Sequence, residues 1–519
     1  MFTQRLALSL TLLLLPVAAR GQAPQPDADP KRYFGIEVVD DQSGRGVPMV
    51  ELQATTGARY YTDSAGRIAF HEPGLMNRKV FFNVASHGYE FAKDGFGIRG
   101  VVLETTPGTS KTLKIKRLNI AERLYRMTGY GVYRDSVLLG KEPPVAEPLL
   151  NGEVTGQDGI LTAVHKGKTY WFYGDTGRLA YALGNFAMAG ATSDAPDTLD
   201  PDRGISLSYF TGPDGFARRM APREGPGVVW LYGLAVLPDE SGRERMVAYF
   251  QRKPGLEGTT EEGFMAYNDD KEVFEKIVDV PVGPALAPTG YPSPIRQDGT
   301  DYVYFTAPYP AIRVKADWTS YIDVSQYEGY TPLKPGTRYG SKDAARLDRD
   351  AQGKLVWAWK RGTPPLSAVQ QEELIEAGTL KREETPFRLA DSETGKPVLL
   401  NNASCFWNDY RKKFLLIASE MKGATMLGEV WYAEADRPEG PWTAARKIIT
   451  HANKPGDAHD FYNPSQHPFL DREGGRIIYI EGSYVNTFSG NPHPTPYYEY
   501  NQILYRLDLA DPRLRLPGD

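Results

Sequence analysis

Four carboxylates stand at the ends of predicted β-strands, where a side chain can point into a site instead of the core. Asp158 precedes one aromatic-rich hairpin and Asp175 follows its second strand, while Glu429 begins and Glu481 ends later strands. Two carboxyl groups across a cleft can protonate a glycosidic oxygen and either activate water or attack the anomeric carbon. Asp158, Asp175, Glu429 and Glu481 are therefore candidate catalytic residues.

These aspartates also have a structural interpretation. Aspartate is common where a chain reverses, because its side chain accepts hydrogen bonds from nearby backbone N–H groups. Asp158 and Asp175 could therefore brace turns instead of doing chemistry. The sequence leaves both interpretations open.

Five further residues are candidates for binding a substrate. Tyr232 and Tyr462 begin predicted inner strands, and tyrosine rings suit the apolar faces of sugars. Asn463 and His467 share the motif Asn-Pro-Ser-Gln-His-Pro, from which the histidine could face a central channel. Arg313 could hold an anionic substituent through a bidentate contact, although a structural ion pair would account for it equally well.

Other kinds of active site have little support. The sequence has no Gly-x-Ser-x-Gly elbow and no glycine-rich phosphate loop, and its only cysteine, Cys405, lies in an apolar predicted strand. Three histidines and two aspartates between residues 451 and 467 match no tight metal-ligand motif. We therefore predict no metal and no cofactor.

The composition excludes some partners. The chain has 519 residues with 60 Lys+Arg against 65 Asp+Glu and a formal net charge of −5. Because nucleic-acid and anionic-membrane binding depend on clustered positive charge, neither partner is expected. A single cysteine also allows no intrachain disulfide.

The N-terminus predicts export. An apolar run over residues 6–17 follows Arg5 and is succeeded by small residues and a polar, proline-rich stretch. This pattern is typical of a secretory signal peptide, here residues 1–23, with cleavage after Ala19, Gly21 or Ala23. The run is too short to span a bilayer, so we expect no membrane insertion of the mature chain and a secreted or periplasmic location.

A repeated β-hairpin predicts the main domain. Each copy has an aromatic-rich second strand and a third strand that ends in an acidic or Asn turn. The second strands are 168–173, 245–250, 302–305, 413–417 and 476–480, and the third strands are 205–209, 263–267, 312–316, 429–433 and 502–507. Five sheets at this spacing favour a five-bladed β-propeller over residues 151–510, in which the segment at about 318–400 is an insertion or else a sixth blade.

A smaller domain precedes the propeller. Residues 33–118 alternate apolar and polar residues in short strands, and the pattern resembles a carboxypeptidase-regulatory (transthyretin-like) β-sandwich. Residues 119–150 are predicted to be a connector, with a short helix over 120–125. The predicted fold class is all-β: a five-bladed β-propeller preceded by a small β-sandwich domain.

The predicted loop lengths indicate which propeller face carries the site. The connections from second to third strands, at 176–204, 251–262, 420–428 and 482–500, are longer than the turns on the opposite face. Long loops in compact folds are usually functional. The candidate carboxylates lie on this face, so we expect a site at one end of the propeller axis.

Short motifs resemble a known family. Phe172-Tyr173-Gly174-Asp175-Thr176 and Glu429-Val430-Trp431-Tyr432-Ala433, with the aspartate that opens the first blade, resemble the five-bladed propeller glycoside hydrolases of the arabinanase and β-xylosidase class, family 43 and its relatives. The resemblance implies that Asp158 is the general base. It also implies an acidic residue at the inner strands near Tyr232 and Ser293, where this sequence has none, so Asp175, Glu429 and Glu481 are substitutes chosen by geometry.

The sequence is compatible with three functions. The first is an exported glycoside hydrolase that acts on a polysaccharide or oligosaccharide through paired carboxylates. The second is a propeller-type polysaccharide lyase, with His467 or a tyrosine as base and Arg313 neutralising a uronate. The third is a non-catalytic propeller that binds glycans or proteins. The sequence does not predict an oligomeric state.

Overall fold

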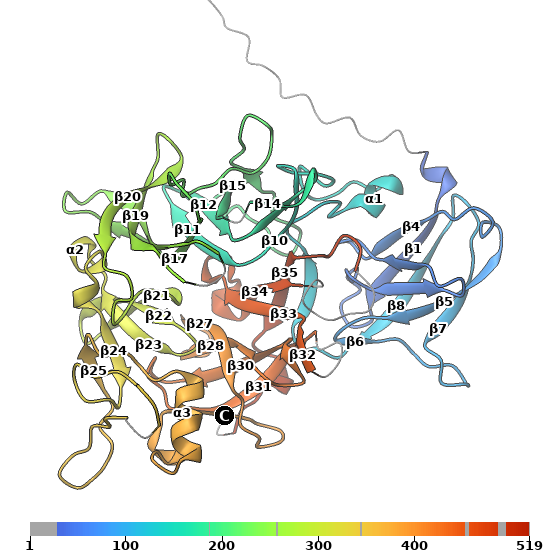
Figure 1. Cartoon of the computed structure of the whole chain (residues 1–519). Helices are drawn as coiled ribbons and strands as arrows, with labels where there is room; N and C mark the ends of the chain where they lie inside the picture. The colour runs from blue at the N-terminus through green and yellow to red at the C-terminus, as the bar shows by residue number, and fades with distance from the viewer. Residues whose placement is uncertain are drawn as a thin grey trace, which may run out of the picture.

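The computed structural model describes residues 29–185, 187–255, 258–342, 345–451, 456–485 and 495–517. The predicted signal peptide lies outside these residues. The described chain is built almost entirely from β-strands, in a small sandwich that lies beside a larger ring of sheets (Figure 1). No helix among the described residues is long and apolar enough to cross a membrane.

The N-terminal domain is a sandwich of two four-stranded sheets, with orders β4-β1-β8-β6 and β3-β2-β5-β7. Along β5 the side chains of Val80, Phe82 and Val84 are buried while their neighbours are more exposed, as the period of two requires. Its strands are β1 (Phe34–Asp40), β2 (Glu51–Ala54), β3 (Arg59–Tyr61), β4 (Arg67–Phe70), β5 (Lys79–Ala85), β6 (Tyr89–Glu90), β7 (Gly100–Glu104) and β8 (Ser110–Arg117).

Five larger sheets of the described residues form the main domain. The first contains β11 (Ile160–His165), β12 (Lys168–Tyr173), β15 (Ala189–Ser193) and β16 (Ser208–Tyr209), and the second β17 (Val228–Pro238), β18 (Glu244–Lys253), β19 (Glu261–Asn268) and β20 (Val273–Val280). The third contains β21 (Tyr291–Gln297), β22 (Thr300–Thr306), β23 (Pro310–Lys315), β24 (Glu328–Thr331) and β25 (Ala358–Arg361). The fourth contains β26 (Phe387–Asp391), β27 (Leu400–Asn408), β28 (Lys413–Glu420), β30 (Glu429–Ala435) and β31 (Trp442–Thr450), and the fifth β33 (Phe461–Gln466), β34 (Ile477–Tyr484), β35 (Asn501–Asp508) and β9 (Glu122–Arg126).

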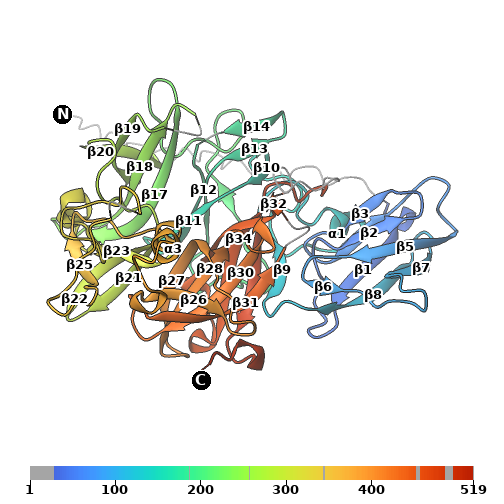
Figure 2. The ribbon, with the colours of Figure 1, turned by 60° about the horizontal axis from the view of Figure 1, so that its bottom comes forward.

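The sheets are arranged as a ring. The first strands β11, β17, β21, β27 and β33 pack against one another in chain order, which places them around a common axis (Figure 1; Figure 2 shows four of them from another side). Two hydrogen bonds join the fifth sheet to the segment just before the first and so close the ring. The Gly159 N–H donates to Ser483 Oγ at 3.2 Å, and Gln502 Nε2 donates to the Gln157 carbonyl at 3.0 Å. The predicted fold class, an all-β propeller preceded by a small β-sandwich domain, is confirmed.

The ring is closed by a strand from upstream of the propeller repeats. Strand β9 pairs antiparallel with β35 and completes the fifth sheet, so the helix predicted over 120–125 is wrong. All five residues of β9 are buried. Burial on both faces removes the periodicity that distinguishes a strand from a helix, which explains the error. The segment predicted to be a connector also contains α1 (Arg134–Leu138), which packs against β4.

Two further details differ from the sequence prediction. The third strand of the first sheet is β15, whereas part of the predicted segment 205–209 forms the fourth strand, β16. The segment 318–400 adds strands to existing sheets: β24 and β25 extend the third and β26 joins the fourth, parallel to β31. This segment also holds α2 (Trp318–Tyr321) and α3 (Ala368–Glu376). Two small sheets complete the domain, one of β10 (Val154–Gln157), β13 (Thr176–Arg178) and β14 (Tyr181–Asn185) and one of β29 (Thr425–Leu427) and β32 (Gly456–His459).

The sandwich and the propeller share a core. Met49 and Tyr61 of the sandwich belong to the same buried apolar cluster as Ile480 and Tyr505 of the fifth sheet. Arg123 of β9 is 1% exposed, and its guanidinium donates to the carbonyls of Pro48 and His87. The interface is therefore apolar and hydrogen-bonded, unlike a loose contact between independent domains.

Candidate active site

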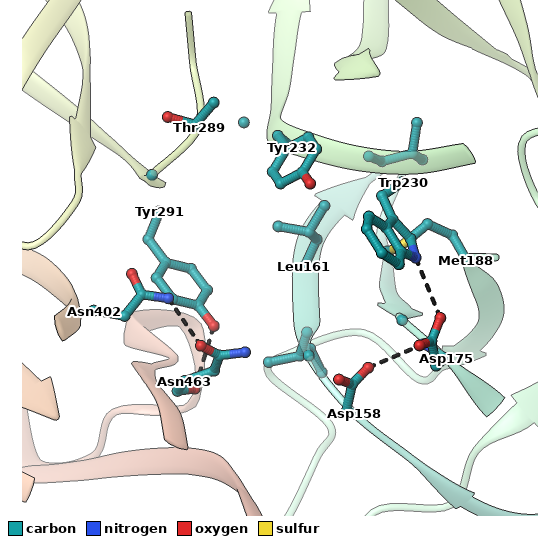
Figure 3. Close-up of a pocket in the computed structure, with 16 residues that line it drawn as sticks. Asp158, Leu161, Asp175, Met188, Trp230, Tyr232, Thr289, Tyr291, Asn402 and Asn463 are labelled. Atoms are coloured by element: carbon teal, nitrogen blue, oxygen red, sulfur yellow. Dashed lines mark hydrogen bonds between the residues drawn. The ribbon is translucent and has the colours of Figure 1, made fainter. Parts of the chain in front are cut away.

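A cavity of about 300 Å³ lies at one end of the propeller axis and is called the axial cavity below (Figure 3). It is lined from all five sheets by residues of the first strands, with Leu161, Trp230, Tyr291, Asn402 and Asn463 as one example from each. Because every sheet contributes its innermost strand, the axial cavity lies on the axis of the ring.

Asp158 lies at the edge of this cavity, between β10 and β11. Its Oδ1 accepts the backbone N–H of Asp175 at 3.0 Å, and its Oδ2 accepts the Tyr462 hydroxyl at 3.0 Å. The Tyr500 hydroxyl lies next to the same carboxyl group and favours its charged form. Burial raises the pKa of Asp158 above its ordinary value, and these hydrogen bonds oppose the rise.

The turn at Gly174 allows this arrangement. A Cβ atom at position 174 would lie 2.4 Å from Asp158 Oδ1, so only glycine lets the carboxylate approach the backbone so closely. The Gly174 N–H also donates to the Asp158 carbonyl at 2.7 Å. The hairpin β11–β12 therefore brings Asp158 and Asp175 together at its open end.

Asp175 is the second carboxyl group in the cavity. Its Oδ1 accepts the Trp230 indole N–H at 3.2 Å. Burial, and then the negative charge of Asp158, raise the pKa of Asp175 to about 7, while the Trp230 hydrogen bond lowers it. Asp175 consequently retains its proton close to neutral pH, where an ordinary aspartate would be ionised.

The opposite wall carries neutral hydrogen-bonding groups. Figure 3 shows Tyr291, Asn402 and Asn463 across the cavity from Asp158 and Asp175. Asn402 Nδ2 donates to Asn463 Oδ1 at 3.0 Å, and the Tyr291 hydroxyl donates to the Asn463 carbonyl at 3.2 Å. Asn463 has a φ of 51°, a left-handed conformation that asparagine tolerates better than most residues. This wall can donate to and accept from sugar hydroxyls.

Two of the predicted binding residues, Tyr232 and Asn463, line the cavity. A third, Tyr462, does not line it but donates a hydrogen bond to Asp158. Burial, and then the charge of Asp175, raise the pKa of Tyr232 to about 12, so its hydroxyl stays neutral.

Arg313 lies elsewhere, in the third strand of the third sheet. Its Nε forms an ion pair with Glu328 at 2.9 Å, and its guanidinium stacks 4.2 Å from the ring centroids of both Tyr302 and Trp359. Nη1 donates to Gln297 at 2.9 Å. These partners occupy the guanidinium, and the position is inconsistent with the predicted role in binding substrate.

His467 and Glu481 form a buried pair inside the ring. His467 Nε2 lies 2.8 Å from Glu481 Oε2, and the two side chains are 1% and 0% exposed. The Trp171 ring packs edge-on to His467, with centroids 5.4 Å apart. Neither residue lines the axial cavity, so the catalytic role predicted for Glu481 and the binding role predicted for His467 do not fit their positions.

Glu429 is also outside the axial cavity. It forms an ion pair with Lys447 and accepts the Ala424 N–H at 3.2 Å. Burial, and then a hydrogen bond to Glu429, raise the pKa of Glu420 to about 7. Glu429 is thus engaged with Lys447 and Glu420 within the fourth sheet, and the catalytic role predicted for it does not fit this position.

Sequence reasoning missed several residues of the site, among them Trp230, Asn402 and Tyr500. Trp230 stands two positions before Tyr232 in β17, so the period of two would have placed both on one face. Asn402 lies near the start of β27, where inner-strand residues reach the cavity. Tyr500 had no local signal, because its place depends on how the fifth sheet meets the first.

Comparison with known proteins gives only distant likeness. No protein-family model and no curated protein sequence matches the chain. Among solved structures, a putative hydrolase from Bacteroides ovatus ATCC 8483 is 15% identical with a TM-score of 0.39 and covers 68% of this chain and 86% of that one. A GH43 β-xylosidase/α-arabinofuranosidase from a compost microbial metagenome is 14% identical with a TM-score of 0.33, covering 69% and 92%. An α-L-arabinanase from Penicillium chrysogenum is 14% identical with a TM-score of 0.35, covering 75% and 99%. Likeness this distant carries no argument about activity.

Proposed function

We propose that the protein is an exported glycoside hydrolase that cleaves a polysaccharide or oligosaccharide in the axial cavity. The observation that carries the proposal is the pair Asp158 and Asp175, two carboxyl groups in one cavity with different environments. Asp158 accepts several hydrogen bonds that favour its charged form, whereas Asp175 accepts one and holds a proton near pH 7. Environments that separate two carboxyl groups in this way supply a base and an acid to one site.

In the proposed reaction, Asp158 removes a proton from water as the water oxygen bonds to the anomeric carbon. The glycosidic C–O bond breaks, and Asp175 donates its proton to the departing oxygen, which leaves as a hydroxyl group. The rings of Trp230 and Tyr232 offer apolar faces to the sugar, and Asn402 and Asn463 can hydrogen-bond its hydroxyls.

The charge of the cavity favours a neutral sugar. Among the described residues that line it, none is a lysine, arginine or histidine, and two are aspartates. A uronate would meet two carboxyl groups without a cation to offset its charge. The lyase alternative needs such a cation, and Arg313 and His467 are engaged with Glu328 and Glu481 instead.

Incubation of the purified protein with neutral and uronate-containing glycans tests the proposal. New reducing ends from a neutral glycan, without the ultraviolet absorbance of unsaturated sugar ends, are the expected result. Unsaturated products would establish the lyase. Tight glycan binding without any cleavage would favour the non-catalytic alternative.

The role of Asp175 has a pH signature. Since Asp175 must be protonated to act as an acid, kcat/KM is expected to fall as the pH rises through about 7. In Trp230→Phe the indole hydrogen bond that favours the carboxylate is lost, so the pKa of Asp175 rises and this alkaline limb should move to higher pH, by up to about one unit. A pH profile of kcat/KM for both proteins measures the shift. An alkaline limb near pH 7 that survives in Asp175→Asn would assign it to another group.

Export is part of the proposal and rests on the apolar leader before residue 24. The mature protein is expected to begin between Arg20 and Pro24. N-terminal sequencing of the extracytoplasmic protein measures this directly, and an intact Met1 there would contradict it.

A further inference from the structure

Two phenols, one in the fifth sheet and one just before its strand β35, lie beside the carboxyl group of Asp158, which precedes the first sheet. Tyr462 of β33 donates to Asp158 Oδ2 at 3.0 Å. The hydroxyl of Tyr500, the residue before β35, lies next to both groups and favours the charged form of Asp158. The candidate base is therefore surrounded by phenols at the point where the ring closes.

The backbone of Tyr500 is strained. Its φ is 58°, and that of Tyr497 is 69°, in the left-handed region that bulky residues rarely adopt. Such strain persists only where surrounding contacts enforce it, and it is common at functional sites. The Gln157 N–H donates to the Tyr500 carbonyl, and Asn501 Nδ2 donates to the Glu499 carbonyl at 2.6 Å.

Gly156 makes this contact possible. A Cβ atom at position 156 would lie 2.6 Å from the Glu499 carbonyl oxygen and 2.7 Å from that of Tyr500. Any other residue would therefore push the segment away. The chain just before Asp158 holds the Tyr500 backbone in place, and the Tyr500 hydroxyl in turn holds Asp158.

The groups around Asp158 show what the hydroxyls of Tyr462 and Tyr500 do. The titratable groups around Asp158 are Asp175 from the end of β12, Tyr291 from β21, Tyr462 from β33 and Tyr500. Burial disfavours a negative charge on Asp158, whereas the backbone N–H of Asp175 favours it. The hydroxyls of Tyr462 and Tyr500 are the side-chain donors that favour it.

We propose that Tyr500 and Tyr462 are positioning residues for Asp158: their hydroxyls stabilise its carboxylate and fix its orientation at the axial cavity. The inference rests on the proposed function, in which Asp158 is the base. It adds that Asp158 is oriented by residues from both sides of the point where the ring closes, and not by the first sheet alone.

The test compares Tyr500→Phe and Tyr462→Phe with the wild type. Each substitution keeps the ring and removes one donor, so the pKa of Asp158 should rise and the acidic limb of the kcat/KM profile should move up by about one pH unit. Tyr209→Phe is the control, because the Tyr209 hydroxyl donates to Gln157 Oε1 at 2.6 Å, beside Asp158 but not to it. This control should leave the limb in place even if the melting temperature falls.

A second readout separates this inference from the proposed function. Carboxyl infrared bands that vanish in Asp158→Asn report the protonation of Asp158 without any substrate. An upward shift of their titration in either Phe variant supports the positioning role, even if no protein in the series cleaves a glycan. Infrared titrations and acidic limbs that match the wild type in both folded Phe variants would overturn it.

Discussion

Asp158→Asn is expected to lower kcat by about 10³-fold while the protein remains folded and still binds its glycan. The amide has the shape of the carboxylate and can still accept the Asp175 N–H, but it cannot take a proton from water. Activity on a glycan that the wild type cleaves and a thermal melt of each variant provide the measurement.

Glu429→Gln is the matched control for this experiment. Glu429 is a carboxylate on the same face of the propeller, but it lies outside the axial cavity and is paired with Lys447. Its substitution should leave kcat within a few-fold of the wild type. Full activity in folded Asp158→Asn would contradict the assignment of Asp158 as the base. An equal loss of kcat in both variants would show that the assay measures loss of folded protein and not loss of the base.

Arg123→Met should lower the free energy of unfolding by about 3 kcal/mol or more, since hydrogen bonds to charged groups contribute roughly 1.5–3 kcal/mol each. Arg123 donates to the carbonyls of Pro48 and His87, to Ser86 Oγ at 3.1 Å and to the Tyr505 hydroxyl at 3.2 Å. Methionine fills a similar volume but leaves these buried acceptors without a donor. Chemical denaturation measures the difference.

Arg99→Met is the control for the interface. Arg99 pairs with Glu90 at the surface of the sandwich, where the two side chains are 35% and 38% exposed. Exposed ion pairs contribute about 0–1 kcal/mol, so this variant should unfold almost like the wild type. Equal stabilities for Arg123→Met and Arg99→Met would mean that the sandwich and the propeller are independent, contrary to the shared core.

The fold class and the closeness of Asp158 and Asp175 could be predicted from the sequence, because they depend only on the repeated aromatic strands and on local hairpin geometry. The tight turn after His165 sets the register of the hairpin, in which Ile160 pairs with Tyr173 at the open end. The residues just beyond this pair, including Asp158 and Asp175, must therefore lie side by side. That inference needs only local register. The fold class followed in the same way, from a repeat that recurs along the chain.

Features that depend on distant pairing were not predictable. Strand β9 is buried on both faces, so its sequence carries no period, and its partner β35 is almost 400 residues away. Glu481 satisfies every sequence criterion for a strand-end carboxylate, yet its side chain turns inward to His467. Arg313 is similar, because only the fold shows that Glu328 already occupies it.

The crystal structure of Asp158→Asn soaked with the glycan that the wild type cleaves would test the central claim most directly. The expected result is a sugar ring in the axial cavity between Asp175 and the pair Asn402 and Asn463, with its anomeric carbon next to position 158. A glycan bound elsewhere on the protein, with the axial cavity empty, would contradict the account.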